Sequence, residues 1–276
     1  MYRCPLCQQP LLPNPQGLAC ASRHQFDRAR EGYLNLLPVQ QKKSLDPGDS
    51  PAMIQARRAF LQAGFYQPLS DAINQIMLSL TLPTEPNLLD IGCGEGYYSA
   101  RLQQALRAQM EPHGQFYGID ISKAAVKAAA KQYPQLQVAV ASSYQLPFAD
   151  QSIAALLRIY APSKAAELAR VCQLGGYLLT VTPAPQHLLQ LKQRIYSDVR
   201  LHSDHINGEE GFVHTKRQQL SWTFQPQDAA SLAQLLQMIP LGYRFTSEIR
   251  QQLLVDLPAI QLDFYLDLYQ RSEQQP

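Results

Sequence analysis

The chain has 276 residues, 46% of them hydrophobic and 17% charged, which is enough apolar material for a sizeable globular core. No run of about 18 apolar residues is present, so we expect no transmembrane helix, and the start lacks the pattern of a signal peptide. The formal net charge is +2, but residues 1–58 carry eight Lys/Arg against only four acids. We therefore expect a cytoplasmic protein whose basic front segment suits a polyanion, although an ordinary solvated surface explains this charge about as well.

Residues 1–36 are interrupted by prolines and glycines, and no apolar periodicity extends far in them. Three of the five cysteines lie here, and with one histidine they form the pattern Cys4-x2-Cys7-x12-Cys20-x3-His24. Two close pairs of such ligands suit a closed, tetrahedral structural zinc site, and so short a module could hardly fold without the metal. The alternatives are four unrelated residues or a redox Cys-x2-Cys pair, but a redox pair expects a neighbouring βαβ pattern that this segment lacks.

A linker follows this module, and two helices are expected after it. Residues 45–51 have the composition of a turn that leads into a helix. Ser50 is a favourable N-cap and Pro51 fits the first helical position, so the first helix should run from Pro51 to Gly64. Apolar residues at helical spacing predict a second helix over about 67–80.

From Asn87 onward, short apolar runs alternate with helical segments. We expect strands at 88–91, 116–121, 137–141, 153–160 and 177–182, separated by helices at about 97–110, 122–132 and 163–173. Continuously apolar strands separated by helices indicate a mostly parallel sheet that is covered on both faces. Beyond Pro183 we expect a helix at 186–197, a polar stretch at 201–212, a strand at 213–224, a helix at 226–238 and a last strand at 261–270.

A glycine-rich loop follows the first of these strands. It contains Asp90, Gly92, Gly94, Glu95 and Gly96. The Gly-x-Gly-x-Gly spacing allows a tight turn and close approach of a ligand to the backbone, and it differs from the Gly-x-Gly-x-x-Gly of dinucleotide sites. Two carboxylates disfavour a phosphate but suit a cofactor with an ammonium group and a sulfonium. Asp120 ends the second strand, where a carboxylate can accept both ribose hydroxyls, so the combination predicts an S-adenosylmethionine site.

Three further stretches agree in position with such a site. Residues 142–148 follow the third strand and would lie beside the adenine, and residues 158–162 end the fourth strand, where the methyl group should face its acceptor. Gly175-Gly176 precedes the fifth strand as a turn. Each stretch by itself is explained more simply as an ordinary strand end.

Several segments of the chain, most of which outside the glycine loop are not common to methyltransferases in general, occur together. They are the Cys4/Cys7/Cys20/His24 set, Arg23–Asp27, Glu31–Tyr33, Asn35–Gln40, Asp46–Ser50, Ala56–Leu61, Asp90–Tyr98, Arg158–Pro162 and Thr182-Pro183 before His187. Through them the chain resembles the bacterial large-subunit rRNA (guanine-N1)-methyltransferases of the RlmA type. The resemblance covers almost the whole chain and is closest up to about residue 197.

This resemblance implies a Rossmann-like class I methyltransferase fold, α/β with a mostly parallel seven-stranded sheet, behind an N-terminal zinc-binding module. It implies methylation of a guanine N1 in a stem-loop of 23S ribosomal RNA, by a homodimer whose zinc modules help to grip RNA and which has no DNA partner. In that family the cofactor also touches residues matching Tyr66 and His187. We expect a zinc-binding module at 1–36, a linker with helices at 37–85 and the catalytic domain at 86–276.

Other functions remain compatible with the sequence. One is a methyltransferase of a small metabolite, and another is a non-catalytic rRNA-binding protein that retains the cofactor fold; an oxidoreductase fits the sheet but not the loop spacing. The target guanine and the group that takes its N1 proton are not identified, and Tyr160 either stacks on the base or packs in the core. His202, His205, Glu209 and Glu210 are interpreted as an exposed loop rather than a second metal site.

Overall fold

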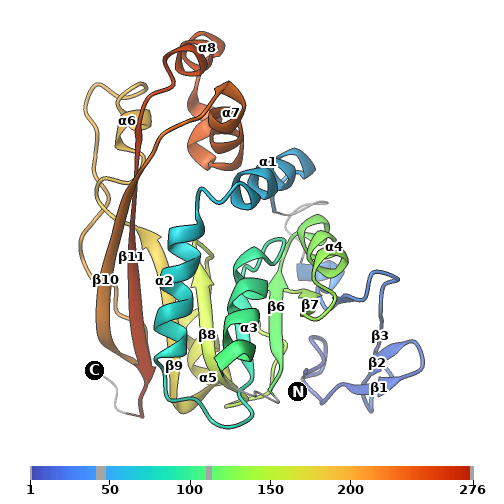
Figure 1. Ribbon diagram of the computed structural model, residues 1–276. Coiled ribbons are helices and arrows are strands. Elements are labelled where there is room, and N and C mark those ends of the chain that lie inside the picture. The colour runs from blue at the N-terminus through green and yellow to red at the C-terminus, as the bar shows by residue number, and fades with distance from the viewer. Residues whose placement is uncertain (1, 42–47, 110–113, 274–276) are drawn as a thin grey trace.

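The computed structural model describes residues 2–41, 48–109 and 114–273. A large eight-stranded sheet of order β10-β11-β9-β8-β5-β6-β7-β4 forms its centre, and a three-stranded sheet, β1-β2-β3, lies near the N-terminus (Figure 1). The strands are β1 (Leu12–Asn14), β2 (Gly17–Ala19), β3 (Gln25–Asp27), β4 (Leu34–Asn35), β5 (Leu88–Ile91), β6 (Phe116–Asp120), β7 (Gln137–Val140), β8 (Ile153–Ile159), β9 (Cys172–Pro183), β10 (Phe212–Phe224) and β11 (Ile260–Arg271).

The large sheet has the topology expected of a class I methyltransferase. The strands from β4 to β9 pair in parallel, while β11 and β10 pair antiparallel at one edge. The seven expected strands are present, and the two-residue β4 adds an eighth beside β7. The expected fold is confirmed, and the sheet has one short strand more than expected.

Two buried clusters cover the two faces of this sheet, because neighbouring residues of a strand point to opposite faces. Leu88 belongs to the cluster with the helices that follow residue 50, whereas Leu89 and Ile91 belong to the other cluster. That second cluster also contains Leu168 and residues of the N-terminal module. The N-terminal module therefore covers part of one face of the sheet.

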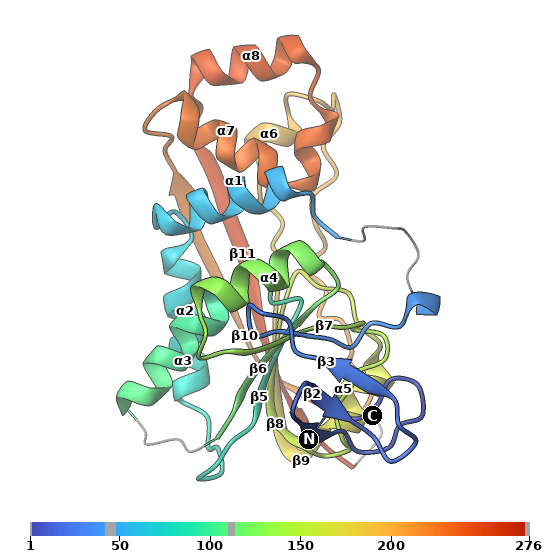
Figure 2. The ribbon, with the colours of Figure 1, turned by 90° about the vertical axis from the view of Figure 1, so that its right-hand side faces the viewer.

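A group of helices lies over the carboxyl ends of the parallel strands (Figures 1 and 2). The full set of described helices is α1 (Pro51–Gln62), α2 (Gln67–Leu78), α3 (Tyr97–Gln109), α4 (Lys123–Gln132), α5 (Ala165–Val171), α6 (Leu189–Lys192), α7 (Ala229–Met238) and α8 (Ser247–Asp256), with 3-10 turns η1 (Val39–Gln41) and η2 (Pro240–Arg244). The group over the carboxyl ends of the strands consists of α1, α6, α7, α8 and η2, and we call this group the cap. Within the described ranges, no helix combines the length and the apolar character that a bilayer crossing needs.

The expected helix starts are confirmed. The Ser50 hydroxyl accepts a hydrogen bond from the amide of Met53 at 3.3 Å, and the Ser122 hydroxyl accepts one from the amide of Ala125 at 3.3 Å. These bonds satisfy amide groups that have no partner inside the first helical turn. Short polar side chains in the sequence thus mark where α1 and α4 begin.

Two expectations are wrong in detail. The helix expected at 186–197 is reduced to α6, because Leu188 adopts a left-handed φ of 57° and the chain after Lys192 continues in tight three-residue turns. The turn expected at Gly175-Gly176 lies inside β9, which absorbs it as a register irregularity against β8. A Cβ on Gly176 would lie 2.7 Å from the carbonyl oxygen of Ala154, so a glycine is needed where the two strands approach.

The sequence pattern predicts no element between residues 239 and 260, but η2 and α8 lie there. Thr246 caps α8 by accepting a hydrogen bond from the amide of Ile249 at 3.3 Å. Leu253 is the one fully buried residue of α8. A helix with so narrow an apolar face has little periodicity, and for this reason the pattern did not predict it.

The expected division at residues 36 and 85 stays a prediction. β4, which lies at the end of the first part, pairs in parallel with β7 of the large sheet. The expected linker region contributes α1 and α2, whose buried side chains belong to the same cluster as α3 and α4. Parts that look separate in sequence therefore share one core.

Candidate functional site

The four expected zinc ligands come together in the N-terminal module. Their sulfur and nitrogen atoms all lie within 4.8 Å of one another. His24 Nδ1 lies 3.5 Å from Cys4 Sγ and 3.4 Å from Cys20 Sγ, and Cys7 Sγ lies 3.6 Å from Cys20 Sγ. A tetrahedron with Zn–S bonds of ~2.3 Å and a Zn–N bond of ~2.0 Å has edges of roughly 3.5–3.8 Å. The residues therefore fit a four-coordinate structural zinc ion that has no open position.

A backbone turn lies at each of the two ligand pairs. The amide of Gln8 donates to the carbonyl of Cys4 at 2.8 Å, and the amide of Arg23 donates to the carbonyl of Cys20 at 2.9 Å. Gln8 and Arg23 have φ values of 61° and 63°, a left-handed conformation that costs a non-glycine residue on the order of 1 kcal/mol. The two turns differ in length, but each places a left-handed residue next to a metal ligand, which indicates that bonds to a metal offset the cost.

The module is attached firmly to the large sheet. Tyr2 forms a backbone bridge with Phe148, and the amide of Arg3 donates to the carbonyl of Pro147 at 2.9 Å. The Tyr2 ring lies 5.4 Å from the Tyr117 ring and 5.0 Å from the Phe148 ring, measured between centroids. These aromatic contacts fix the zinc site relative to the sheet.

A cavity of about 840 Å³ lies between the carboxyl ends of β5 to β9 and the cap. This is the edge at which open α/β sheets bind ligands, because the chain reverses its direction of strand addition between β5 and β8. The volume is in the range of roughly 300–1,000 Å³ that small-molecule sites occupy. The cavity can therefore hold a cofactor and one further group of similar size.

Seven of the eight expected cofactor residues line this cavity. They are Tyr66, Asp90, Gly92, Gly94, Glu95, Asp120 and His187. Gly96 is not among the lining residues. It has a φ of 83°, and a Cβ there would lie 3.1 Å from Leu136 and 3.2 Å from Tyr133, on the side of α4 rather than of the cavity. Gly96 thus lets the loop pack against α4 and its following turn, and the roles of all eight residues toward a ligand stay a prediction.

Asp120 holds the glycine loop in place. Its Oδ2 accepts from the amide of Gly94 at 3.0 Å, and its Oδ1 accepts from the amide of Ser122 at 2.7 Å. Gly92 has a φ of 75°, and a Cβ there would lie 2.5 Å from the Cβ of Ala161 at the end of β8. By contrast, no atom lies within 4 Å of a Cβ placed on Gly94, which leaves the backbone there open to a ligand.

Asp90 is a buried carboxyl group with one unsatisfied oxygen. Its Oδ2 accepts a hydrogen bond from the Ser99 hydroxyl at 2.5 Å, while its Oδ1 is buried and has no hydrogen-bond partner among the described residues. Burial is the main cause that raises the pKa of Asp90 to about 7, and the nearby Asp120 adds to it. A cationic group in the cavity would satisfy this oxygen, and an ammonium group is what the cofactor offers.

Glu95 lies beside Asp90 in the loop but has a partner. Its Oε2 accepts from Arg58 Nε at 2.7 Å, although burial still raises the pKa of Glu95. Arg57 pairs with Asp49, and both line the cavity. Two of the eight basic residues of the front segment thus face carboxylates at the cavity instead of forming part of a free basic surface.

The two residues implied only by the family resemblance also reach the cavity. Tyr66 caps the start of α2 and is buried among Phe60, Trp222 and Phe264. His187 Nδ1 accepts from the amide of Asp263 at 3.3 Å, so its Nε2 carries the hydrogen of the neutral ring. Burial is the main cause that lowers the pKa of His187 to about 3. No local sequence pattern marks either residue, since both depend on packing between distant segments.

The cap side of the cavity has no signal in the sequence pattern. Lining residues come from the end of α7, from η2, and from the segment that contains α6: Met238, Ile239, Pro240, Leu241, Arg244, Leu188, Lys192 and Tyr196. They have no motif spacing. Residues 188–196 follow β9 directly, whereas residues 238–244 come after β10, which ends at the same edge of the sheet as β9. Tyr160 and His202 line the cavity as well, and Tyr160 has a left-handed φ of 54°.

The polar stretch at 201–212 does not form a second metal site in the described ranges, where the cysteine–histidine set of the module is the one group of that kind. His202 turns toward the cavity, and Glu209 pairs with Arg158 at the end of β8. His205 and Glu210 are exposed as expected, but His202 and Glu209 are partly buried, because one faces the cavity and the other pairs with Arg158. Arg158 thereby ties the loop to the strand end.

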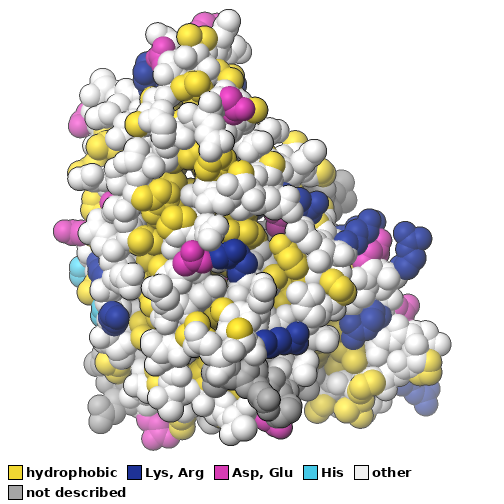
Figure 3. Space-filling model, in the orientation of Figure 1, with side chains coloured by type: hydrophobic (Ala, Val, Ile, Leu, Met, Phe, Trp, Pro, Cys, Tyr) yellow, Lys and Arg dark blue, Asp and Glu magenta, His cyan; other side chains and the backbone are white. Residues whose placement is uncertain are grey.

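The basic residues of the front segment, residues 1–58, do not all lie on one exposed surface. Arg23, Arg28 and Arg30 are exposed on the zinc module. Figure 3 shows Lys and Arg side chains over this module and over α4, at the right-hand edge. Lys42 and Lys43 lie outside the described residues.

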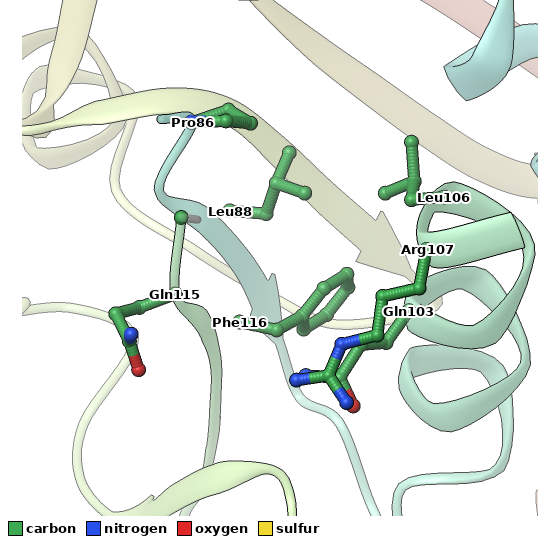
Figure 4. A pocket seen from close by; sticks show the side chains of 8 residues that line it. Pro86, Leu88, Gln103, Leu106, Arg107, Gln115 and Phe116 are labelled. Atoms are coloured by element: carbon green, nitrogen blue, oxygen red, sulfur yellow. The ribbon is translucent and has the colours of Figure 1, made fainter. Parts of the chain in front are cut away.

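A second hollow lies at the opposite edge of the sheet, at the amino ends of β5 and β6 (Figure 4). It is lined by Leu88, Leu106 and Phe116 together with Pro86 and Arg107, and its volume is about 20 Å³. That is room for little more than one water molecule. It is therefore too small to bind a cofactor, unlike the cavity at the carboxyl edge.

Two family models match the chain. One is a zinc-ribbon model described as "RlmA, N-terminal", which matches residues 2–45. The other is described as "Methyltransferase domain" and matches residues 84–225, about half of the chain. The first covers the four metal ligands, and the second covers the glycine loop and Asp120.

Curated relatives match over most of the chain. A Bacillus subtilis protein provisionally named 23S rRNA (guanine-N(1)-)-methyltransferase YxjB is 30% identical, covering 97% of this chain and 95% of that protein. A Micromonospora griseorubida protein, provisionally named for the same activity, is 35% identical over 70% of this chain and 69% of that protein. The 23S rRNA (guanine(748)-N(1))-methyltransferase of Streptomyces fradiae is 36% identical over 68% of this chain and 65% of its own length.

Solved structures resemble this fold at low sequence identity. One, described as "Conversion of a Disulfide Bond into a Thioacetal Group during Echinomycin Biosynthesis", has a TM-score of 0.50 at 14% identity. It covers 74% of this chain and 81% of that chain. A likeness at this level concerns the fold alone.

Proposed function

The chain belongs to the 23S rRNA (guanine-N1)-methyltransferase family, as an S-adenosylmethionine-dependent enzyme with a structural zinc ribbon, and we propose that it methylates N1 of a guanine in a stem-loop of 23S rRNA. The observation that carries this proposal is the cavity at the carboxyl edge, in which acidic cofactor residues meet a second, aromatic and basic half. The volume of about 840 Å³ suits a cofactor and one base, not a paired duplex.

The cofactor half is proposed as follows. Asp120 would accept the ribose hydroxyls, and Asp90 and Glu95 would hold the cationic amino-acid end beside the open backbone of Gly94. The unsatisfied Oδ1 of Asp90 supports this placement. When bound, S-adenosylmethionine supplies an electrophilic methyl group.

The other residues of the proposed site limit where the cofactor can lie. Gly92 keeps the loop close to the end of β8, Gly96 keeps it close to α4, and Tyr66 and His187 line the far side. Ser143 and Tyr144, which follow β7, also line the cavity and would lie beside the adenine.

The target base would enter between the strand ends and the cap. Guanine N1 is occupied in base pairing, so the base must be unpaired or turned out of its helix before it can be methylated. Tyr160 is 47% exposed and lies at the end of β8, where a flat side chain can stack on such a base. The transfer itself then depends largely on holding N1 close to the methyl group.

Mass mapping of modified guanines in 23S rRNA, from cells with and without this gene, tests the proposal. One N1-methylguanine should disappear with the gene and return with a plasmid copy. A parallel reaction with purified protein and unmodified 23S rRNA should give the same modification. An identical guanine pattern in both strains would contradict the proposal, as would turnover on small metabolites alone.

The family resemblance further supports a homodimer and action in the cytoplasm, where ribosomal RNA is processed. Light scattering of the purified protein should then give twice the 31.0 kDa mass of the chain. A monomer that is fully active on 23S rRNA would overturn the homodimer and leave the reaction as proposed.

A further inference from the structure

One cation in the cavity has no partner within the described residues. Lys192 ends α6, which packs against β11, and its side chain lines the cavity. Its Nζ atom is buried and makes no hydrogen bond. An ammonium group has three donors and no acceptor, and leaving them unsatisfied away from water is costly. Such an arrangement persists where a ligand supplies the missing acceptor.

The groups around Lys192 do not neutralise it. His187 and His202 are its titratable neighbours, and burial lowers the pKa of both, so both are neutral near pH 7. Burial likewise lowers the pKa of Lys192. Asp263 lies behind His187, where it is held by Ser221, Gln219 and Gln186. The other charged or titratable groups that line the cavity are Asp49, Arg57, Tyr66, Asp90, Cys93, Glu95, Tyr97, Tyr98, Asp120, Tyr144, Tyr160, Tyr196 and Arg244.

Lys192 belongs to the half of the cavity that would receive the base. The ring of His187 lies 6.2 Å from that of Tyr160 and 6.4 Å from that of His202, between centroids. Tyr160 follows β8, and in the order β9-β8-β5-β6 the β8 and β9 ends lie on the other side of β5 from Asp120. Lys192 lies close enough to His187 and His202 to contribute to the lowered pKa of both. His187 adjoins both the proposed cofactor site and Tyr160, so Lys192 lies on the β8 and β9 side of the cavity, across β5 from Asp120.

The chemistry of guanine supplies an acceptor for this ammonium group. The N1 lone pair of neutral guanine is not free, so the N1–H bond must break before N1 can form a bond to carbon. The proton passes to solvent water, and the negative charge left behind is shared between N1 and O6. As the N1–CH3 bond forms, the S–CH3 bond breaks and its electron pair stays on sulfur. A fixed cation at O6 would stabilise this charge at the moment it develops.

We propose that Lys192 donates a hydrogen bond to O6 of the target guanine and stabilises the loss of its N1 proton. This inference rests on the proposed function. It also accounts for selection against adenine, which presents an amino donor at the position of O6. Lys192 is then a catalytic residue that touches the substrate, and it acts on ionisation of the base rather than on cofactor binding.

Single-turnover methylation of 23S rRNA, at saturating RNA and S-adenosylmethionine from pH 6 to 9, tests this role. Lys192→Met should lower the rate at pH 7 by about 100-fold, as removal of one preorganised charge-stabilising donor does. Its rate should continue to rise at pH values where the wild type has levelled off. Lys192→Arg should retain most of the rate, and ethylammonium ions should partly restore Lys192→Ala. Lys131→Met removes an exposed lysine of α4 and should match the wild type.

The outcomes separate this inference from the proposed function. Wild-type protein that makes no N1-methylguanine refutes the proposed function itself. If the wild type is active and Lys192→Met keeps its rate and pH profile, only the role of Lys192 is refuted. Weaker S-adenosylmethionine binding by calorimetry, with an unchanged pH profile, would make Lys192 a cofactor residue and overturn the inference. Circular dichroism and the Lys192→Arg variant guard against loss of folding.

Discussion

The zinc site and the cavity at the carboxyl edge of the sheet are built in opposite ways. All four zinc ligands lie between residues 4 and 24, in turns whose backbone bonds are local. The cavity takes residues from Gly48 to Arg244, and it joins five strand ends to a cap that returns late in the chain. The zinc site is also closed, with four ligands and no open position, whereas within the described residues the cavity leaves Asp90 Oδ1 and Lys192 Nζ without partners.

This difference teaches what each region is for. A site whose ligands satisfy one another completely contributes to folding, because binding the metal fixes the chain. A site that keeps buried donors and acceptors unsatisfied costs stability, and the missing partners must come from a ligand. Stability and chemistry are thus assigned to separate regions, and the predictions below test that separation.

The largest effect is expected from Cys20→Ala. The zinc content should fall from close to one ion per chain to nearly none, and the module should unfold, since binding of structural zinc contributes on the order of 10 kcal/mol. S-adenosylmethionine affinity should change by no more than about threefold, because none of the described module residues lines the cavity. Elemental analysis and calorimetry measure the two effects. Cys172→Ala, at a buried cysteine outside the module, is the control, and a folded, metal-free Cys20→Ala module would refute the comparison.

Asp120→Ala should have the next largest effect, and on the other region. It removes a carboxylate that holds Gly94 and would hold the ribose, and hydrogen bonds to a charged group contribute about 1.5–3 kcal/mol each. We expect S-adenosylmethionine affinity to fall by at least about 100-fold by calorimetry, with normal zinc content. Asp198→Ala, at an exposed position, should bind normally. Unchanged affinity in Asp120→Ala would mean that the cofactor site is misplaced.

Asp90 should make stability depend on pH. Its pKa is raised to about 7 in the folded protein, so its favourable contribution is complete below pH 4 and is lost as the pH rises through 7. The lowered pKa of His187 acts in the opposite sense, since stability from that residue is lost as the pH falls toward 3. The wild type should therefore be compared with Asp90→Asn.

Urea unfolding without cofactor measures this dependence. From pH 5 to pH 8, the wild type should lose roughly 2.5 kcal/mol relative to Asp90→Asn, at about 1.4 kcal/mol per pKa unit. Saturating S-adenosylmethionine should reduce the loss, because its ammonium group favours the ionised carboxylate. If the difference in unfolding free energy between the two proteins does not vary with pH, burial does not raise the pKa of Asp90.

The smallest effect is expected from changing Arg28 and Arg30 together to Ala. Both side chains are exposed on the zinc module, where they would bind RNA phosphates. The KM for rRNA should rise by a few-fold, and the slope of binding against salt should fall by roughly one for each phosphate that is no longer neutralised. Cofactor affinity and the target guanine should not change.

Arg107→Ala, at an exposed position near the opposite edge of the sheet, is the matched control for this pair. If the double variant binds rRNA like the wild type across the salt titration, the basic surface is only solvated. The RNA would then be gripped elsewhere, for example by the cap.

The sequence by itself determined the local features of this protein. Cys4, Cys7, Cys20 and His24 could be assigned as one site because a few residues of chain cannot carry two ligands of a pair far apart. The order of strands followed from continuous apolar runs, which burial on both faces requires. Likewise, Ser50 and Ser122 marked helix starts, since an N-cap acts within three residues of itself.

Only the tertiary structure decided which distant residues share the cavity. Contacts with β11 position the single turn α6 that carries Lys192, where the sequence pattern predicts a longer helix. The inward position of His202 and the helix α8, which packs against α7, have no pattern in the sequence. Gly96 shows the converse, as its spacing suggested a ligand contact while packing against Tyr133 and Leu136 explains the glycine. Spacing along the chain predicts the distance in space between two residues only when a few residues separate them. For that reason the zinc site could be predicted from the sequence, and the cap side of the cavity could not.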